Sequence, residues 1–234
     1  MEIKVLKNIL GANEQIARKN RELLEKNGVF AVNIMASPGA GKTSLVLQTI
    51  AAVKGKVKVG VIEGDIASKI DAETVGKAGV PVVQINTGGE CHLDANMIQN
   101  ALANLPLKDI DLLLIENVGN LVCPAEFNLG EHRKVLVASV PEGDDKPYKY
   151  PAMFTAADAV VLNKTDLLPY VKFNLEAFTK AVNGINAKAG VFPLSCTTGD
   201  GVPAWTKWLQ KQMRPATSPR RGELGRALGT HKGK

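Results

Sequence analysis

The feature that most constrains this chain is a glycine-rich turn directly after an apolar, β-branched run. The run covers residues 29–35, and the turn reads Ala36-Ser37-Pro38-Gly39-Ala40-Gly41-Lys42-Thr43. In such a turn the backbone N–H groups point inward at phosphate oxygens, and the next helix directs its positive dipole end toward them. Because residues 44–53 have a helix-compatible spacing of apolar side chains, we predict a nucleoside triphosphate site between a strand and this helix.

The residues of the turn have distinct expected roles at that site. Lys42 would reach the β- and γ-phosphate oxygens, and Thr43 would place its hydroxyl on Mg²⁺. The phosphate-binding set is Ser37, Pro38, Gly39, Ala40, Gly41, Lys42, Thr43 and Ser44. Ala36 departs from the usual spelling, which has glycine at that position. The alternative interpretation is a plain glycine-rich turn that joins a strand to a helix.

A second motif predicts which base the nucleotide carries. Asn163-Lys164-Thr165-Asp166 ends the apolar run 159–162. The Asp166 carboxylate would accept hydrogen bonds from the ring N–H and the exocyclic amine of guanine, whereas adenine offers the wrong donor pattern. GTP is therefore the expected ligand, with Asn163, Lys164 and Asp166 at the base. The alternative is a solvated loop in which Asp166 caps a helix.

The segment Ser195-Cys196-Thr197 follows the last apolar run. It is similar to loops that contact guanine O6 through backbone N–H groups, so Cys196 is interpreted as a small loop residue and not a metal ligand. The chain has three cysteines, an odd number at wide spacing. We therefore expect reduced thiols, available as thiolate ligands, and no disulfide framework.

Acidic residues that follow two apolar runs are candidates for the Mg²⁺ site. Asp65 follows the run 57–63, and Glu116 follows the run 112–115. Glu116 stands where the commoner motif has aspartate, so direct and water-mediated contacts with Mg²⁺ both stay open. Gly119 is a candidate γ-phosphate sensor through its backbone N–H. The catalytic candidates are Lys42, Asp65, Glu116 and Gly119.

The segment after Gly119 bears on the rate of hydrolysis. Asn120 stands there, so the sequence offers no evident water-orienting glutamine, and no arginine finger is identifiable. Unassisted turnover is expected at about 10⁻⁴ to 10⁻² per second, by analogy with GTPases that act without a partner.

Cys91-His92 and Cys123 form a second constellation. Thiolate and imidazole ligands suit Ni²⁺ and Zn²⁺, and a set of two cysteines and one histidine leaves one tetrahedral position open or shared with another subunit. Cys91 follows the run 80–85 through a glycine-containing loop, and Cys123 stands seven positions after Glu116. The alternative is a pair of buried thiols beside a helix-capping loop. His132 is a spare candidate ligand, although a surface histidine beside a helix is its more usual role.

Seven short apolar runs alternate with helix-compatible segments. The runs cover residues 29–35, 57–63, 80–85, 112–116, 135–140, 159–163 and 191–194. This alternation favours a three-layer α/β P-loop NTPase fold, with a mostly parallel sheet of about seven strands and helices on both faces. Because ligands of such sheets bind outside the carboxyl ends of the strands, the candidate residues above are expected at one edge.

Length and composition indicate one main domain, which we place at residues 29–213. Residues 1–28 are expected to form an amphipathic helix packed on it, with apolar positions at Ile3, Leu6, Ile9, Leu10, Ile16, Leu23 and Leu24. Of the net charge of +6, residues 214–234 carry +5, so this tail is expected to be disordered and the near-neutral body does not predict nucleic-acid binding. Neither a membrane span nor a signal peptide is recognisable, so we expect a cytoplasmic protein.

Together these motifs resemble the HypB family of GTPases, which assist nickel insertion during maturation of nickel-iron hydrogenase. The matching segments are residues 37–43, 63–65, 87–94, 116–124, 142–147 and 163–166. The resemblance implies a homodimer promoted by GTP, with Cys91, His92 and Cys123 of both subunits binding nickel or zinc at the interface. It also implies that Lys149 reaches the partner subunit's nucleotide. A HypA-type nickel chaperone and the hydrogenase large subunit are the implied partners.

The leading hypothesis is thus a GTP-hydrolysing metallochaperone with GTP or GDP, Mg²⁺ and Ni²⁺ or Zn²⁺ as ligands. One alternative is a related accessory GTPase for urease or a cobalamin-dependent mutase. Another is a dimeric binding protein in which GTP gates association and the metal is structural zinc. The chain starts Met1-Glu2-Ile3-Lys4, without a Cys-x-x-Cys site or a histidine-rich tract, so we expect no nickel storage. The sequence leaves open the identity of the metal, the client enzyme and the order of the strands in the sheet.

Overall fold

The computed structural model describes residues 6–66 and 70–213. Within these residues, seven strands form one sheet in the order β3-β2-β4-β1-β5-β6-β7, and every neighbouring pair is parallel. The strands are β1 Phe30–Ala36, β2 Val59–Asp65, β3 Val82–Asn86, β4 Leu112–Glu116, β5 Arg133–Ser139, β6 Ala159–Asn163 and β7 Gly190–Pro193. The predicted α/β fold with a parallel sheet is confirmed, and each of the seven apolar runs overlaps one strand.

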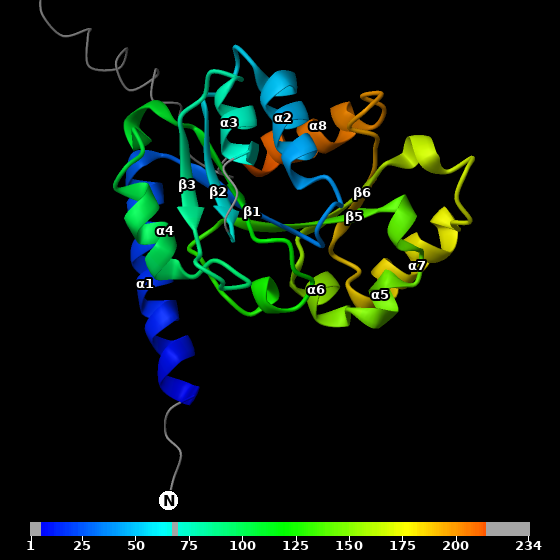
Figure 1. Cartoon of the computed structure of the whole chain (residues 1–234), viewed down its shortest axis with the longest axis horizontal. Coiled ribbons are helices and arrows are strands. Elements are labelled where there is room, and N and C mark those ends of the chain that lie inside the picture. The colour runs from blue at the N-terminus through cyan, green and yellow to red at the C-terminus, as the bar shows by residue number, and fades with distance from the viewer. Residues whose placement is uncertain (1–5, 67–69, 214–234) are drawn as a thin grey trace, which may run out of the picture.

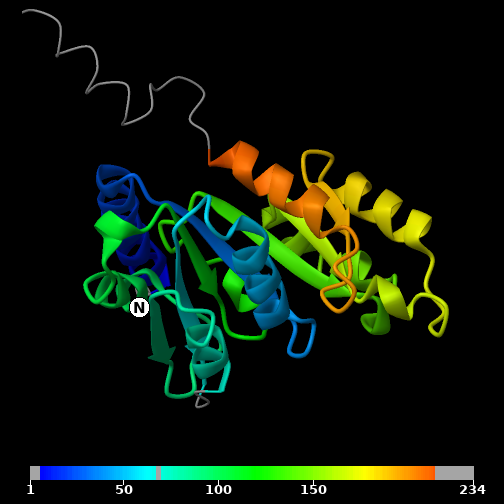
Figure 2. The same ribbon diagram turned by 90° about the horizontal axis from the view of Figure 1, so that it is seen from above.

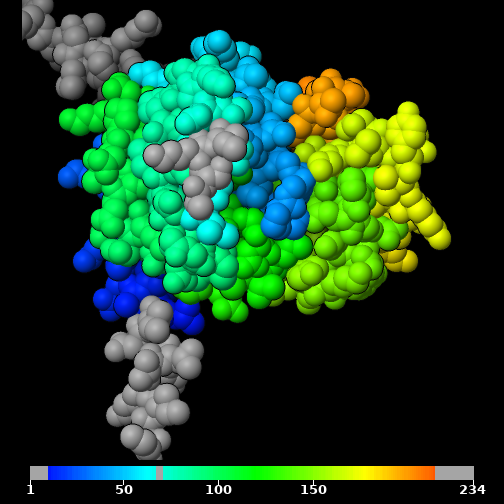
Figure 3. Space-filling model, in the orientation of Figure 1, coloured from blue at the N-terminus to red at the C-terminus, as the bar shows by residue number. Residues whose placement is uncertain are grey.

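The strand order places β1 at the centre of the sheet. After β1 the chain builds one side with β2, β3 and β4, and it then crosses to build the other side with β5, β6 and β7. The carboxyl end of β1 is therefore the point where the direction of winding reverses, which is where parallel sheets bind ligands. The glycine-rich turn follows β1 at this point. In the space-filling view the blue surface of this region lies between the cyan-to-green and the yellow parts of the molecule (Figure 3).

Helices cover both faces of the sheet (Figures 1 and 2). One face packs against α2 Lys42–Val53, α3 Ile70–Gly76 and α8 Val202–Gln212. The other face packs against α1 Leu6–Asn27, α4 Ala95–Leu102, α6 Pro151–Ala156 and α7 Leu175–Ile185. A short helix α5, Lys146–Lys149, precedes α6. Successive strand residues alternate between the two faces, so the five inner strands are largely buried on both sides. The edge strands β3 and β7 are only partly buried.

The inward face of α1 differs from the expected apolar stripe. Its buried positions are Asn13, Ala17, Asn20 and Leu24, whereas Leu10 is 44% exposed and Leu23 is 37% exposed. Two asparagines face inward because α1 crosses loop backbone, and that backbone needs hydrogen-bond partners. The N-terminal position Ile3 and the tail 214–234 lie outside the described residues. Among the helices of the described part, none has the length and apolar character to cross a membrane.

Candidate nucleotide site and metal centre

The turn between β1 and α2 requires glycine at defined positions. Gly39 and Gly41 have φ angles of 75° and 99°, which L side chains rarely adopt. A Cβ atom on Gly41 would also lie 2.3 Å from Nδ2 of Asn163. Ala36, by contrast, is the last residue of β1 and is fully buried in the core. Because this position belongs to the strand and not to the turn, alanine in place of glycine leaves the loop intact.

Asn163 and Lys164 brace the turn from the end of β6. Asn163 Nδ2 donates to the Ala40 carbonyl at 3.0 Å, and Lys164 Nζ donates to the Gly39 carbonyl at 2.7 Å. Asn163 Oδ1 accepts from the backbone N–H of Lys164 and of Cys196, at 2.7 and 3.1 Å. The motif therefore fixes the turn and the loop after β7 relative to each other.

The predicted base-binding residues lie together at the ends of β6 and β7. Ser195 Oγ donates to Asp166 Oδ1 at 2.6 Å, and the backbone N–H groups of Thr197 and Thr198 donate to Ser195 Oγ. The Cys196 carbonyl accepts from Gln48 of α2 at 2.8 Å. Burial and the nearby Asp166 charge raise the pKa of the Cys196 thiol to about 11. The expectation that all three cysteines offer thiolates is thus wrong for Cys196, while its interpretation as a loop residue fits its position.

A cavity of about 270 Å³ opens between the glycine-rich turn and the ends of β2 and β4. The predicted residues that line it are Pro38, Gly39, Lys42, Asp65, Glu116 and Gly119. Gly119 lies close against the turn, because a Cβ atom on it would be 3.1 Å from Cα of Pro38. The structure therefore brings the predicted phosphate-binding lysine, both acidic candidates and the γ-phosphate sensor to one concave site.

Two buried glutamates at this cavity form a pair across neighbouring strands. Glu63 of β2 is in register with Glu116 of β4, and both are at most 5% exposed. Burial, and then the neighbouring Glu116, raise the pKa of Glu63 above its ordinary value. The pKa of Glu116 is also raised by burial, against the opposing effect of Lys42. Sequence reasoning did not assign a role to Glu63; its position two residues before Asp65, on the same face of the strand, is the signal that would have found it.

The same carboxylates fit a divalent cation. Thr43 Oγ1 donates to Glu116 Oε1 at 3.0 Å, while Glu116 Oε2 and Glu63 Oε1 are buried without a hydrogen-bond partner among the described residues. Buried carboxylate oxygens without a partner are costly unless a cation or a proton satisfies them. Thr43, Glu116 and Asp65 would hold Mg²⁺, which would neutralise phosphate charge when bound.

Glu142 is a second residue that sequence reasoning did not single out. Its Oε1 accepts from Ser37 Oγ in the glycine-rich turn, and its Oε2 accepts from Ser139 N–H and Oγ, each at 2.8 Å. Lys146 lies 4.0 Å from it. Glu142 thereby fixes the start of the turn to the end of β5.

Cys91, His92 and Cys123 form one compact cluster, as predicted from their positions after strand ends. Their candidate ligand atoms all lie within 4.8 Å of one another. The two Sγ atoms are 3.2 Å apart, and Cys91 Sγ is 3.7 Å from His92 Nδ1. The His92 ring packs against Phe127 in a tilted arrangement, with ring centroids 3.8 Å apart. Two thiols and an imidazole at these separations fit a single Ni²⁺ or Zn²⁺ ion.

Two further candidates lie away from the cluster and the cavity. Lys149 on α5 forms an ion pair with Asp145 of the same chain, and its side chain is 60% exposed. His132 accepts from the Ala31 N–H at 3.0 Å and is largely buried. Burial and nearby arginines lower its pKa to about 4. His132 is therefore neither a ligand of this cluster nor the surface histidine that was expected.

Comparison with known proteins finds a family model and close relatives. The model "CobW/HypB/UreG, nucleotide-binding domain" matches residues 30–193. The chain is 47% identical over 210 residues to hydrogenase maturation factor HypB of Azotobacter vinelandii, covering 90% of this chain and 69% of that protein. The solved structure of HypB from Archaeoglobus fulgidus has 43% identity and a TM-score of 0.82, covering 87% of this chain and all of that one. HypB from Helicobacter pylori, solved in complex with nickel, has 36% identity and a TM-score of 0.83, covering 89% and 100%.

Proposed function

The chain belongs to the HypB proteins of the CobW/HypB/UreG family, and on this premise we propose that it is a GTP-hydrolysing nickel metallochaperone for nickel-iron hydrogenase. In this proposal the nucleotide state sets the affinity of Cys91, His92 and Cys123 for the metal. Nickel is the cargo, and hydrolysis ends the state in which it is transferred.

The phosphate end of the cavity supports GTP hydrolysis. Lys42 lines the cavity and is only 9% exposed, so its charge is partly removed from water and acts strongly on phosphate oxygens. Asp166 offers the carboxylate acceptor that guanine needs. Among the described residues that line the cavity there is no arginine, and Gln84 is the one glutamine. Gln84 interacts with a partner of its own, so we do not assign it to orienting the attacking water. Slow unassisted turnover is consistent with this.

The observation that carries the proposal is the short path from the phosphate cavity to the metal cluster. Glu116 ends β4 at the cavity, Gly119 lies against the glycine-rich turn, and Cys123 opens a single helical turn shortly afterwards. A displacement of Gly119 by the γ-phosphate would therefore move the backbone that carries a metal ligand. Order and position changes of such loops are a common response to hydrolysis in GTPases.

The cluster also supports a dimer. One chain offers three ligands, and Zn²⁺ or Ni²⁺ sites commonly take four, so a second copy that brings its own cluster would complete the coordination. Lys149, exposed on α5, would reach the partner's nucleotide in such a dimer. A HypA-type nickel chaperone would supply the metal, and the hydrogenase large subunit would receive it.

A titration of Ni²⁺ tests this function. The absorption band of thiolate-bound nickel is followed with GDP, with a non-hydrolysable GTP analogue and with the matching ATP analogue, and the mass of the complex is measured in each sample. We expect nickel affinity to differ between the GDP and GTP-analogue forms on the order of tenfold. The ATP analogue should act like no nucleotide, because Asp166 cannot pair with adenine.

Two cysteine variants make the titration specific. Cys123→Ser should abolish the absorption band, whereas Cys196→Ser should retain it, because Cys196 lies in the base-binding loop. If nickel affinity were the same in the GDP and GTP-analogue forms, the coupled function would be wrong, and a structural metal in a GTP-gated dimer would be the better description.

A further inference from the structure

Two asparagines flank the loop that touches the glycine-rich turn. Asn117 and Asn120 stand on either side of Val118 and Gly119, and Asn117 is fully buried. A buried amide side chain is costly unless its donor and acceptor atoms are paired. The hydrogen-bond partners of each asparagine therefore show which segments hold the loop in place.

Asn117 attaches the loop to the residue after His92. Its Oδ1 accepts from the Val118 N–H at 2.9 Å and from the Leu93 N–H at 3.0 Å. Its own backbone N–H donates to the Ile34 carbonyl of β1 at 3.0 Å. One amide oxygen thus joins the turn that leads to Gly119 with the backbone that carries His92.

Asn120 attaches the same loop to Cys91 and to the residue before Cys123. Its Nδ2 donates to the Cys91 carbonyl at 3.3 Å, and its Oδ1 accepts from the Val122 N–H at 2.8 Å. Its backbone N–H donates to the Ala36 carbonyl at 2.8 Å, at the start of the glycine-rich turn. The pair Cys91-His92 is therefore held at both ends by side chains of the Gly119 loop.

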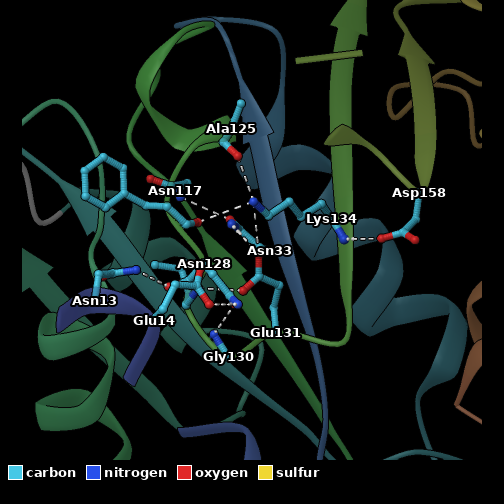
Figure 4. A network of polar contacts seen from close by, with 12 residues as sticks. Asn13, Glu14, Asn33, Asn117, Ala125, Asn128, Gly130, Glu131, Lys134 and Asp158 are labelled. Atoms are coloured by element: carbon cyan, nitrogen blue, oxygen red, sulfur yellow. Dashed lines mark hydrogen bonds and ion pairs between the residues drawn. The ribbon is translucent and has the colours of Figure 1, made fainter. Parts of the chain in front are cut away.

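Asn117 also belongs to a network of polar contacts in the core (Figure 4). Asn117 Nδ2 donates to Asn33 Oδ1 at 3.1 Å, and Asn33 Nδ2 donates to Glu131 at 3.4 Å. Lys134 lies 3.8 Å from Glu131 and donates to the Ala125 carbonyl at 2.9 Å. Asn33 lies on β1 and Lys134 on β5, and these strands pair with each other. The network therefore ties Asn117 to the sheet and, through Lys134, holds the loop after Cys123.

We propose that Asn117 and Asn120 are the positioning residues that couple the nucleotide to the metal centre. When Gly119 shifts with the γ-phosphate, Asn120 carries the backbone of Cys91 and Val122 with it. Asn117 and the core network meanwhile hold Leu93 and the residues after Cys123 in place. The separation of the ligand atoms then changes, and with it the nickel affinity. This inference rests on the proposed function, because it assigns the residues through which that coupling passes.

The test compares Asn120→Ala and Asn117→Ala with the unaltered chain. For each protein, the nickel dissociation constant is measured with GDP and with a GTP analogue, together with the affinity for the analogue itself. We expect the ratio of the two nickel constants to fall from the order of tenfold to below about twofold, with analogue affinity unchanged. Asn120 is only partly buried, so its variant is expected to fold even if Asn117→Ala does not.

Asn186→Ala is the matched control. Its Nδ2 donates to the carbonyls of Phe154, Thr155 and Ala157 in the other half of the sheet, so it loses comparable hydrogen bonds and should keep the ratio. If the unaltered chain bound nickel equally well with GDP and with the GTP analogue, the proposed function would be overturned. Two outcomes would overturn this inference alone. In the first, nickel affinity in the unaltered chain depends on the nucleotide and both asparagine variants keep that dependence. In the second, the variants weaken nickel binding equally in both nucleotide states.

Discussion

At the scale of single residues, the carboxyl pair Glu63 and Glu116 has the strongest electrostatic consequence. The two acidic side chains lie side by side at the cavity, both are largely removed from solvent, and the Lys42 charge acts on both. Burial favours the neutral acid, so the chain without nucleotide and Mg²⁺ retains protons that an unfolded chain would lose. A cation bound between these carboxylates would offset the cost in stability of burying them.

Glu63→Gln should stabilise the nucleotide-free chain at alkaline pH and not at acidic pH. The folded pKa of Glu63 is raised above its ordinary value of 4.5, so its unfavourable contribution is absent below that value and grows as pH rises above it. At about pH 8 we expect a gain in the free energy of unfolding on the order of 2 kcal/mol, and at about pH 4 almost none.

Urea unfolding at both pH values, without nucleotide or Mg²⁺, measures this difference. Glu73→Gln on the exposed surface of α3 is the control, because it makes the same substitution outside the buried pair. A gain of equal size at both pH values would show that Glu63 is not held as the neutral acid.

At the scale of elements, helix α1 joins the two segments that carry the metal ligands. Asn20 Nδ2 donates to the carbonyls of Ala95 and Leu129, at 2.8 and 3.0 Å. Asn13 accepts from the Ala95 N–H and donates to the Asn128 carbonyl, both at 2.8 Å. Ala95 begins α4 just after His92, and the other two residues follow the loop of Cys123. The helix thus holds the two ligand-bearing segments side by side.

Asn20→Ala should weaken nickel binding equally in the GDP and GTP-analogue forms. The change removes two buried hydrogen bonds and is expected to lower the free energy of unfolding by about 1–3 kcal/mol. The change loosens the two segments that Asn20 joins and leaves the Gly119 loop intact. The ratio of nickel affinities between the GDP and GTP-analogue forms should therefore persist. Asn27→Ala is the control, because its amide bonds only within α1, to the Leu23 carbonyl. A loss of the ratio in Asn20→Ala would show that α1 takes part in the nucleotide response.

The elements also show what a sequence can and cannot predict. The strands were predictable because each lies at a short apolar run, as expected for a parallel sheet that helices cover on both faces. The cluster of Cys91, His92 and Cys123 was predictable because its residues follow strand ends on one edge. The sequence did not predict the inward asparagines of α1 or the partners of Asn117 and Asn120, since their hydrogen bonds go to backbone groups of distant segments. Glu63 was missed because an acid at a strand end usually faces solvent.

At the scale of the whole molecule, β1 separates two functional halves. The side with β2, β3 and β4 carries the candidate metal cluster, and the side with β6 and β7 carries the predicted base-binding loops, with β5 between them and β1. The glycine-rich turn after β1 contacts both, through Asn163 on one side and Asn120 on the other. The phosphates would therefore bind at the junction of the halves, where a change in the nucleotide can reach the metal.

The most direct test of this account is the reciprocal effect of nickel on the nucleotide. Coupling between two binding sites must act equally in both directions. The affinities for GDP and for a GTP analogue are measured on the same protein with and without saturating Ni²⁺. The account predicts that nickel changes the ratio of the two nucleotide affinities by the same factor, on the order of tenfold, by which the nucleotide changes nickel affinity. A ratio of nucleotide affinities that nickel leaves unchanged would contradict it.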